Sequence, residues 1–345
     1  MSLKSRIMRR CFDLARLGRG FASPNPIVGA VLVHQERIIG EGYYAKDGGP
    51  HAEVVTVRSV RPADEHLIQE STLYVSLEPC NIWGRTPPCT NLILDQRIPH
   101  VVVAARDLTP GVDGSGLERL RAAGVKVEEA VLPEIGERLS RYRNVYVSQQ
   151  RPYVVLKYAQ TENGFIAPVD ETQFWLTNSI SKRLVHKWRT ETDAILIGPG
   201  TARADNPALT NRLVPGRQPQ RLVIDREAKL PSGLQLFDGA HPTLVITQNP
   251  GEKQGQLDFL ELDFTDEDWP QQLLNQLADR KIAHLTIEGG AWLLRTFVQH
   301  GLWDEARVFS SQHNWSDGKA APNLGVEAQE TFKIAEDTLK VYYRS

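Results

Sequence analysis

Three metal-donor side chains, His51, Cys80 and Cys89, place the strongest restriction on how this chain folds. One imidazole and two thiolates form a donor set that suits tetrahedral zinc with a fourth position open to water. The two thiolates also balance the charge of the ion, so the site can be buried. Glu53, two residues after the histidine, can carry protons to and from that water. The stretch therefore predicts a hydrolytic zinc site with Glu53 as its acid and base.

The cysteines also allow other interpretations. A disulfide between Cys80 and Cys89 is the main rival to a metal site, and a buried cysteine can simply fill core space. The chain has only three cysteines, an odd number, and it opens on a helical pattern without a hydrophobic leader. We therefore expect a reducing, cytoplasmic setting and favour zinc at Cys80 and Cys89. Cys11 lies in an amphipathic run, where we expect it to face the core.

The order His-x-Glu, Pro-Cys and a second Cys is typical of zinc deaminases. Eight residues separate Cys80 from Cys89 here, where the usual spacing is shorter. The loop ends in Gly-Arg-Thr-Pro-Pro-Cys, from Gly84 to Cys89, and the chain also contains Leu-Glu-Pro-Cys at 77–80 and Pro-Asn-Pro-Ile-Val-Gly at 24–29. In these motifs the chain resembles the deaminase half of the bifunctional riboflavin-biosynthesis deaminase/reductases. The resemblance implies a cytidine-deaminase-like, three-layer α/β domain.

Length and charge limit the functions that remain. A chain of 345 residues favours two domains, and a hydrophobic content of 41% is sufficient for ordinary cores. The formal net charge of −2 provides no basic field for nucleic acid, which many zinc deaminases bind. No apolar run approaches the roughly 20 residues that a membrane helix needs. We therefore expect a small-molecule substrate, with no nucleic-acid partner and no membrane span.

The first half alternates between predicted helices and strands, which indicates an α/β layered sheet. A polar helical connector ends near Pro152, and we place the domain boundary near residue 148, with domains at 1–148 and 149–345. We expect helices at 5–17, 52–60, from 89 onward, 116–123 and 133–150, and strands at 27–33, 38–43, 73–77, 100–105 and 125–131.

The second half has the same alternation, and two glycine pairs follow its strands. A strand, a glycine pair and a helix can present unpaired backbone N–H groups to a phosphate, although glycine also simply turns a chain. Gly289-Gly290 fits this pattern, and Gly198-Pro199-Gly200 fits it less clearly. Neither pair is the Gly-x-Gly-x-x-Gly of a Rossmann domain. We expect strands at 153–160, 194–197, 221–224, 243–247 and 284–287, and helices at 179–189, 269–280 and 292–299.

Several motifs of this half resemble the reductase half of the same family. They are Lys157-x-Ala159, Trp175, the run from Thr201 to Leu209, Arg212 and Glu288-Gly289-Gly290. The resemblance implies a fold like dihydrofolate reductase and NADPH as cofactor. It places Ala159, Trp175, Thr201, Asp205, Gly289, Gly290 and Ala291 on the cofactor, and Arg189, Leu209, Arg212 and Glu288 on the sugar-phosphate substrate. It also favours Asn25 as a substrate contact in the first domain. Without the resemblance, the sequence would indicate that Arg189 and Arg212 are surface residues and that Asn25 is a turn residue.

Two segments depart from the family pattern. The family commonly has Ser-Leu-Asp-Gly where this chain has Thr161-Glu162-Asn163-Gly164, so an acidic turn residue becomes an amide. A glycine-rich loop expected after a late strand is replaced by residues 313–319. These departures bear on the reductase pocket and leave the deaminase motif unchanged.

The resemblance implies two reactions. Zinc and Glu53 deaminate 2,5-diamino-6-(5-phosphoribosylamino)pyrimidin-4(3H)-one, and NADPH then reduces the ribosyl to the ribityl side chain. One alternative is a nucleic-acid or nucleoside deaminase with an extra domain. Another is a zinc deaminase whose C-terminal domain only binds nucleotide. We favour the bifunctional enzyme, and we expect a homodimer because reductases of this type are plausible dimers.

Overall fold

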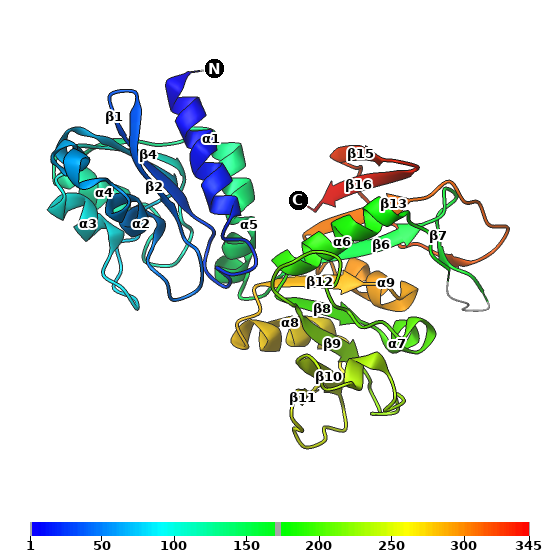
Figure 1. Ribbon diagram of the computed structural model, residues 1–345. Coiled ribbons are helices and arrows are strands. Elements are labelled where there is room, and N and C mark those ends of the chain that lie inside the picture. Colours follow the sequence, from blue (N-terminus) through cyan, green and yellow to red (C-terminus); the bar gives the residue numbers. More distant parts are fainter. Residues whose placement is uncertain (1, 170–173, 345) are drawn as a thin grey trace. The chain divides into compact units, whose positions relative to one another are not determined.

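The computed structural model describes residues 2–169 and 174–344 of the chain (Figure 1). The chain forms two compact units, residues 1–151 and 152–345, and each has its own sheet and its own cores. The boundary expected after residue 148 falls at the end of helix α5 (Pro133–Gln149). Within the described ranges, no helix is both long enough and apolar enough to cross a membrane.

A five-stranded sheet of order β2-β1-β3-β4-β5 lies at the centre of the first unit. Strand β1 pairs antiparallel with β2 and β3, whereas β3, β4 and β5 run parallel. The carboxyl ends of β3 and β4 therefore share one edge of the sheet, which is where open α/β sheets bind ligands. The elements are α1 (Leu3–Arg16), β1 (Gly29–His34), β2 (Arg37–Tyr43), α2 (Ala52–Arg58), η1 (Pro62–Glu70), β3 (Thr72–Leu77), α3 (Cys89–Asp95), β4 (His100–Ala105), α4 (Ser115–Ala122), β5 (Lys126–Glu128) and α5.

Helices cover both faces of this sheet because alternate strand residues point to opposite sides. In β1, Ala30 and Leu32 belong to a core shared with α2, α3 and α4. Val31 and Val33 belong to the opposite core, which contains residues of α1 and α5. Cys11 is fully buried in this opposite core, as its amphipathic run predicts. The first unit is therefore a three-layer α/β domain, as expected.

The second unit has a nine-stranded sheet of order β11-β10-β9-β8-β12-β6-β13-β16-β15. The strands β11, β10, β9, β8, β12, β6 and β13 all run parallel to one another. Strand β16 pairs antiparallel with β13, and β15 pairs antiparallel with β16. The elements are β6 (Tyr153–Gln160), β7 (Phe165–Ala167), α6 (Ser179–Glu191), β8 (Ala194–Ile197), α7 (Pro199–Asp205), β9 (Gln220–Ile224), η2 (Gln235–Phe237), β10 (Thr243–Thr247), β11 (Leu257–Glu261), α8 (Trp269–Asp279), β12 (His284–Glu288), α9 (Ala291–Gln299), β13 (Glu305–Ser310), β14 (Lys319–Ala320), β15 (Glu330–Ile334) and β16 (Asp337–Tyr343).

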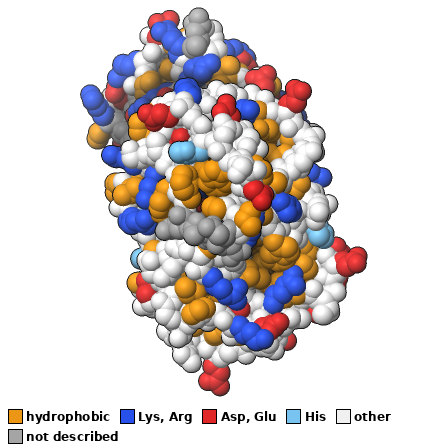
Figure 2. All heavy atoms as spheres, turned by 90° about the vertical axis from the view of Figure 1, so that its right-hand side faces the viewer, with side chains coloured by type: hydrophobic (Ala, Val, Ile, Leu, Met, Phe, Trp, Pro, Cys, Tyr) orange, Lys and Arg blue, Asp and Glu red, His pale blue; other side chains and the backbone are white. Residues whose placement is uncertain are grey.

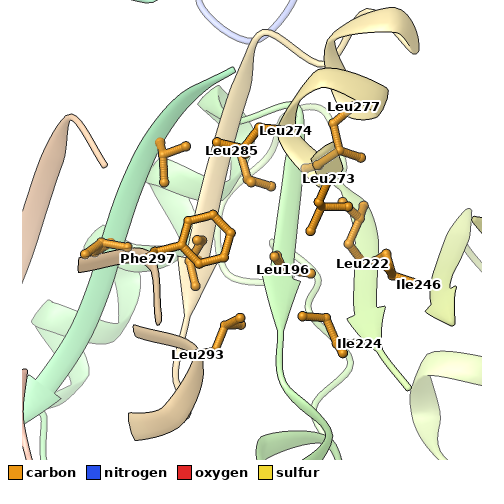
Figure 3. Close-up of a cluster of buried hydrophobic side chains, with 14 of the residues drawn as sticks. Leu196, Leu222, Ile224, Ile246, Leu273, Leu274, Leu277, Leu285, Leu293 and Phe297 are labelled. Carbon is orange, nitrogen blue, oxygen red and sulfur yellow. The ribbon is translucent and has the colours of Figure 1, made fainter. Parts of the chain in front are cut away.

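The largest core of this unit lies between the sheet and helices α8 and α9 (Figure 3). Leu196 and Leu222 project from neighbouring strands toward Leu273 of α8, while Phe297 of α9 covers the strands beside them. The opposite face of the sheet is covered by a second cluster that includes Ala202 of α7. These two cores hold strands β8 and β12 in place, and their carboxyl ends carry the two glycine pairs.

Some elements differ from the sequence expectation. Pro62–Glu70 forms a 3₁₀-helix, and the antiparallel strands β15 and β16 complete the large sheet, although neither was expected. Strand β5 covers only Lys126–Glu128, because Ala130 and Leu132 both adopt a left-handed φ of 59° that ends the strand.

Candidate active sites

Three elements bring the predicted metal donors together. His51 immediately precedes α2, Cys80 follows β3, and Cys89 is the first residue of α3. Their donor atoms lie within 4.8 Å of one another. The Nδ1 atom of His51 lies 3.2 Å from Cys89 Sγ and 3.5 Å from Cys80 Sγ. Residues from three separate turns of the chain thus converge on one point at the carboxyl edge of the sheet.

The donor set fits zinc. All three cysteines of the chain carry free thiols, so Cys80 and Cys89 form no disulfide. The pKa of the Cys80 thiol is lowered to about 5, first by a hydrogen bond with the Cys89 side chain and further by His51. The backbone N–H of Cys89 also donates to Cys80 Sγ at 3.3 Å. These contacts favour a thiolate at Cys80, which is the form that binds a metal ion, whereas the same hydrogen bond with Cys80 raises the pKa of the Cys89 thiol.

Glu53 lies in the first turn of α2, and only 4% of it is exposed. Burial and, to a lesser extent, the charge of Cys80 raise the pKa of its carboxyl to about 6. A carboxyl with this pKa can take up and release a proton near neutral pH. Glu53 therefore has the burial and the acidity that a general acid and base needs.

A cavity of about 260 Å³ is lined by His51, Glu53 and Cys80. Asn25 lines the same cavity, as its predicted role requires. Its Nδ2 atom donates to Tyr44 Oη at 3.1 Å and to Asp47 Oδ1 at 2.7 Å. These bonds orient the amide so that its oxygen, which accepts no hydrogen bond from the described residues, is available to a ligand.

Other residues of this cavity were not singled out from the sequence. Tyr44, Asp107, Thr109 and Arg143 all contribute to its wall, and Arg85 had been noted only as part of the loop motif. The position of Asp107 was a usable signal, because it follows parallel strand β4 at the ligand-binding edge. Arg143 gave no such signal, since it lies within the polar connector helix α5.

The second unit has a larger cavity, of about 1000 Å³, at the carboxyl ends of β8 and β12. Five of the residues expected on the cofactor line it: Thr201, Asp205, Gly289, Gly290 and Ala291. The face shown in Figure 2 carries hydrophobic side chains beside lysine and arginine side chains. The cavity wall has the same mixed character, because it includes Phe174 and Trp292 as well as Arg295 and Lys319.

The two glycines after β12 are required by their conformation. Gly289 and Gly290 have φ values of 82° and 80°, in the region that other residues rarely adopt. A Cβ atom on Gly290 would lie 3.2 Å from Thr201 Oγ1, and one on Gly289 would lie 3.3 Å from the same atom. The backbone of Gly289 and Gly290, just before α9, therefore lies directly against the Thr201 side chain of α7.

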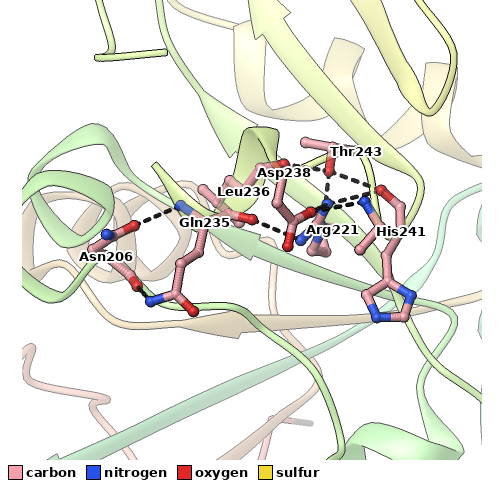
Figure 4. Close-up of polar contacts among 8 residues, drawn as sticks. Asn206, Arg221, Gln235, Leu236, Asp238, His241 and Thr243 are labelled. Carbon is pink, nitrogen blue, oxygen red and sulfur yellow. Dashed lines mark hydrogen bonds and ion pairs between the residues drawn. The ribbon is translucent and has the colours of Figure 1, made fainter. Parts of the chain in front are cut away.

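A polar network fixes the end of α7, where Asp205 lies. The next residue, Asn206, has a left-handed φ of 39° and is tied to Gln235. Gln235 donates from its backbone N–H to Asn206 Oδ1 and from Nε2 to the Asn206 carbonyl, both at 2.7 Å (Figure 4). Arg221 is 1% exposed and donates to the carbonyls of Gln235 and His241. The network thereby holds the wall that carries Asp205.

Two predicted substrate residues bind each other. Arg189 forms a bidentate ion pair with Glu288, with N–O distances of 2.9 and 2.7 Å, and donates to the Thr210 carbonyl at 2.8 Å. Burial alone would raise the pKa of Glu288, but Arg189 and then Lys157 outweigh it and lower the pKa to about 2. Arg189, Glu288 and Lys157 line a cavity of only about 10 Å³.

The remaining predicted residues lie outside the lining of the large cavity. Leu209 is buried in a core with a φ of 51°, and Arg212 is exposed. Ala159 packs beside Phe309, and Trp175 is 60% exposed with the Lys182 ammonium 4.1 Å from its ring centroid. The structure thus gathers five of the predicted pocket residues around one cavity and places these four elsewhere.

The two segments that depart from the family pattern contact each other. Asn163 Nδ2 donates to the Trp315 carbonyl at 2.6 Å, and the Trp315 N–H donates to Asn163 Oδ1 at 3.2 Å. The Glu162 N–H donates to the His313 carbonyl at 2.8 Å. Phe174, which lines the large cavity, has its ring edge-on to both His313 and Trp315. The departures therefore form one joint structure beside the cavity.

Comparison with known protein families finds one match in each unit. The family described as the cytidine and deoxycytidylate deaminase zinc-binding region matches residues 1–105. The family described as the RibD C-terminal domain matches residues 152–311. The metal donors lie within the first match, and the two glycine pairs lie within the second.

Full-length relatives share both parts. The riboflavin biosynthesis protein RibD of Aquifex aeolicus is 36% identical over 336 residues, which cover 95% of this chain and 92% of the relative. The Escherichia coli protein of the same name is 32% identical, over 88% of this chain and 86% of its own.

Solved structures match over the whole chain. A diaminohydroxyphosphoribosylaminopyrimidine deaminase/5-amino-6-(5-phosphoribosylamino)uracil reductase from Thermotoga maritima has a TM-score of 0.91 at 34% identity, covering 99% of both chains. Acinetobacter baumannii RibD has a TM-score of 0.87 at 29% identity, covering 99% of this chain and 98% of its own. The present chain therefore belongs to the RibD family of riboflavin-biosynthesis proteins, bifunctional enzymes with a deaminase domain followed by a reductase domain.

Proposed function

We propose that the first domain deaminates 2,5-diamino-6-(5-phosphoribosylamino)pyrimidin-4(3H)-one and that the second reduces the ribosyl side chain of the product with NADPH. The observation that carries the proposal is the convergence of His51, Cys80 and Cys89 beside buried Glu53, in the same chain as a glycine-lined cavity. The Thermotoga maritima relative carries the same pair of activities in its name.

In the deaminase site, His51, Cys80 and Cys89 would hold the zinc ion. When bound, zinc supplies Lewis acidity that makes water a nucleophile at neutral pH. Glu53 accepts a proton from the attacking water and donates it to the leaving ammonia, in keeping with its raised pKa of about 6. Asn25 accepts a hydrogen bond from the substrate through its amide oxygen, because Tyr44 and Asp47 already bind its nitrogen.

In the reductase site, NADPH supplies the hydride. Gly289, Gly290 and Ala291 would hold the cofactor with the backbone after β12, because N–H groups at a helix start suit phosphates and the absence of a Cβ at the two glycines would allow a close approach. Thr201 supports this segment from α7, and Asp205 offers a carboxylate on the same wall. Ala159 and Trp175 are also proposed as cofactor contacts, although neither lines the cavity. Arg189, Leu209, Arg212 and Glu288 are the proposed substrate contacts, with Glu288 oriented by Arg189.

The test follows ammonia release and NADPH absorbance separately in zinc-loaded protein supplied with the diaminopyrimidine. Glu53→Gln is expected to abolish ammonia release while leaving NADPH oxidation with the deaminated substrate intact. Gly290→Val is expected to abolish NADPH oxidation while leaving ammonia release intact, because the valine side chain would collide with Thr201. Zinc-loaded wild type that releases no ammonia from this substrate would show the assignment to be wrong.

A homodimer and a cytoplasmic location are further proposals, supported by the family resemblance. Size-exclusion chromatography with light scattering tests the first. A mass equal to that of a single chain at all concentrations would rule it out.

A further inference from the structure

One positive charge in the deaminase cavity has no role in the chemistry described above. Arg143 of α5 lines this cavity together with Asn25 and Thr109. Its Nη2 and Nε atoms donate to Thr109 Oγ1 at 3.1 and 3.3 Å, and its Nη1 atom donates to the Pro24 carbonyl at 3.3 Å. All three hydrogen bonds are to uncharged oxygen atoms, and the guanidinium carbon also lies 5.9 Å from the centroid of the Tyr146 ring.

No carboxylate in the described ranges forms an ion pair with Arg143. Asp107 also lines the cavity, but its Oδ1 atom accepts bonds from the backbone N–H and the hydroxyl of Thr109, at 2.9 and 2.6 Å. Burial lowers the pKa of the Arg143 guanidinium, which reflects the cost of holding this charge away from water. An anionic ligand in the cavity would offset that cost.

The guanidinium also has donors left for such a ligand. Arginine carries five N–H groups, and the three contacts above use one on each nitrogen. One N–H on each terminal nitrogen remains, which is the number that a bidentate contact to phosphate needs. Arg85, the other arginine of the cavity wall, is instead paired with Asp47, and its side chain is 65% exposed.

We propose that Arg143 binds the phosphate of the ribosylaminopyrimidine and makes the deaminase specific for the phosphorylated substrate. This inference rests on the proposed deaminase function. The competing explanation is purely structural, because Arg143 also ties the loop at Pro24 to the loop at Thr109, and both loops border the cavity.

The experiment compares two substrates, the phosphorylated diaminopyrimidine and its dephosphorylated form. It uses zinc-loaded full-length wild type, Arg143→Gln, Arg143→Lys and, as control, Arg10→Gln, which removes an exposed ion pair with Glu41. Arg143→Gln is expected to lower kcat/KM for the phosphorylated substrate about 10- to 100-fold, mainly through KM, as for a lost charged hydrogen bond. It should change the dephosphorylated reaction by no more than about twofold. Arg143→Lys should recover part of the loss, because lysine keeps the charge but not the fork.

Inorganic phosphate supplies a second arm. It should inhibit wild type competitively and Arg143→Gln much more weakly. Equal losses on both substrates in Arg143→Gln would overturn the proposal in favour of the structural role. Wild type that deaminates both substrates equally well would overturn it even if the variants do not fold. Wild type that releases no ammonia from either substrate would instead contradict the proposed deaminase function.

Discussion

At the scale of single residues, the reductase cavity depends on two glycines that no other residue can replace without strain. A side chain at residue 290 must adopt a φ of 80° and lies 3.2 Å from Thr201 Oγ1. At this distance the Thr201 side chain must shift slightly to make room for an added Cβ. The wall of this cavity is therefore sensitive to one methyl group.

Gly290→Ala is expected to raise KM for NADPH and to destabilise the fold by about 1–3 kcal/mol, the usual cost of a side chain in a sparsely populated backbone region, because residue 290 has a φ of 80° and a ψ of 105°. Steady-state kinetics and thermal unfolding measure the two effects. Gly233→Ala is the matched control, because no atom lies within 4 Å of its added Cβ. An unchanged KM for NADPH in Gly290→Ala would argue against cofactor binding at this segment.

The Arg189–Glu288 pair predicts how stability changes with pH. The pKa of Glu288 falls from an ordinary 4.5 to about 2 in the fold. A lowered carboxyl pKa stabilises the folded state above pH 4.5, and this contribution is lost as the pH falls from 4.5 toward 2. Wild type should therefore lose stability over this window.

Glu288→Gln is expected to lower the melting temperature at neutral pH, because it leaves Arg189 buried with its charge uncompensated. It should also flatten the loss of stability below pH 4.5. Thermal unfolding followed across the acid range measures both effects. Identical acid profiles for wild type and variant would show that the pair does not govern this transition.

At the scale of elements, the two departures from the family pattern are a matched pair. Asn163 both donates to and accepts from the backbone of Trp315, which the ionised carboxylate of an aspartate cannot do. An aspartate at 163 can accept from the Trp315 N–H, but its carboxylate would face the Trp315 carbonyl. The amide in this turn is therefore explained by the loop it contacts, and the altered turn does not by itself argue against reductase activity.

Asn163→Asp, which restores the residue common in the family, is expected to destabilise this protein by about 0.5–1.5 kcal/mol, the usual net contribution of one hydrogen bond, because the contact is exposed. It should raise KM for NADPH as well, because Phe174 links the loop to the cavity wall. Denaturant unfolding and reductase kinetics provide the measurements. A variant as stable as wild type would show that the contact contributes nothing.

At the scale of the whole molecule, the two activities reside in units with separate cores. Metal binding contributes directly to the stability of the domain that holds the ligands. The zinc donors all lie in the first unit, and the glycine pairs lie in the second.

Chelation of zinc is therefore expected to abolish ammonia release and to lower the unfolding temperature of the first unit. NADPH oxidation with the deaminated substrate should continue at its original rate. Calorimetry and coupled assays before and after chelation, with zinc added back as control, measure this. A parallel loss of both activities would contradict independent sites.

The sequence by itself determined the metal donors, the glycine segments and the alternation of strands and helices. These depend on residue chemistry and local spacing, which are visible along the chain. His51, Cys80 and Cys89 could be chosen because few residue types bind zinc, and Gly289-Gly290 because a strand and a helix flank them.

Only the tertiary structure decided which distant side chains meet. Arg143 reaches Thr109 because α5 packs across the sheet beside the end of β4, and no periodicity of α5 indicates that contact. Arg189 and Glu288 were both assigned to substrate, yet the fold pairs them with each other across 99 positions. Asn163 and Trp315 meet across 152 positions. Such pairings depend on how the strands of the completed sheet align with one another. The local sequence around each residue does not predict that alignment.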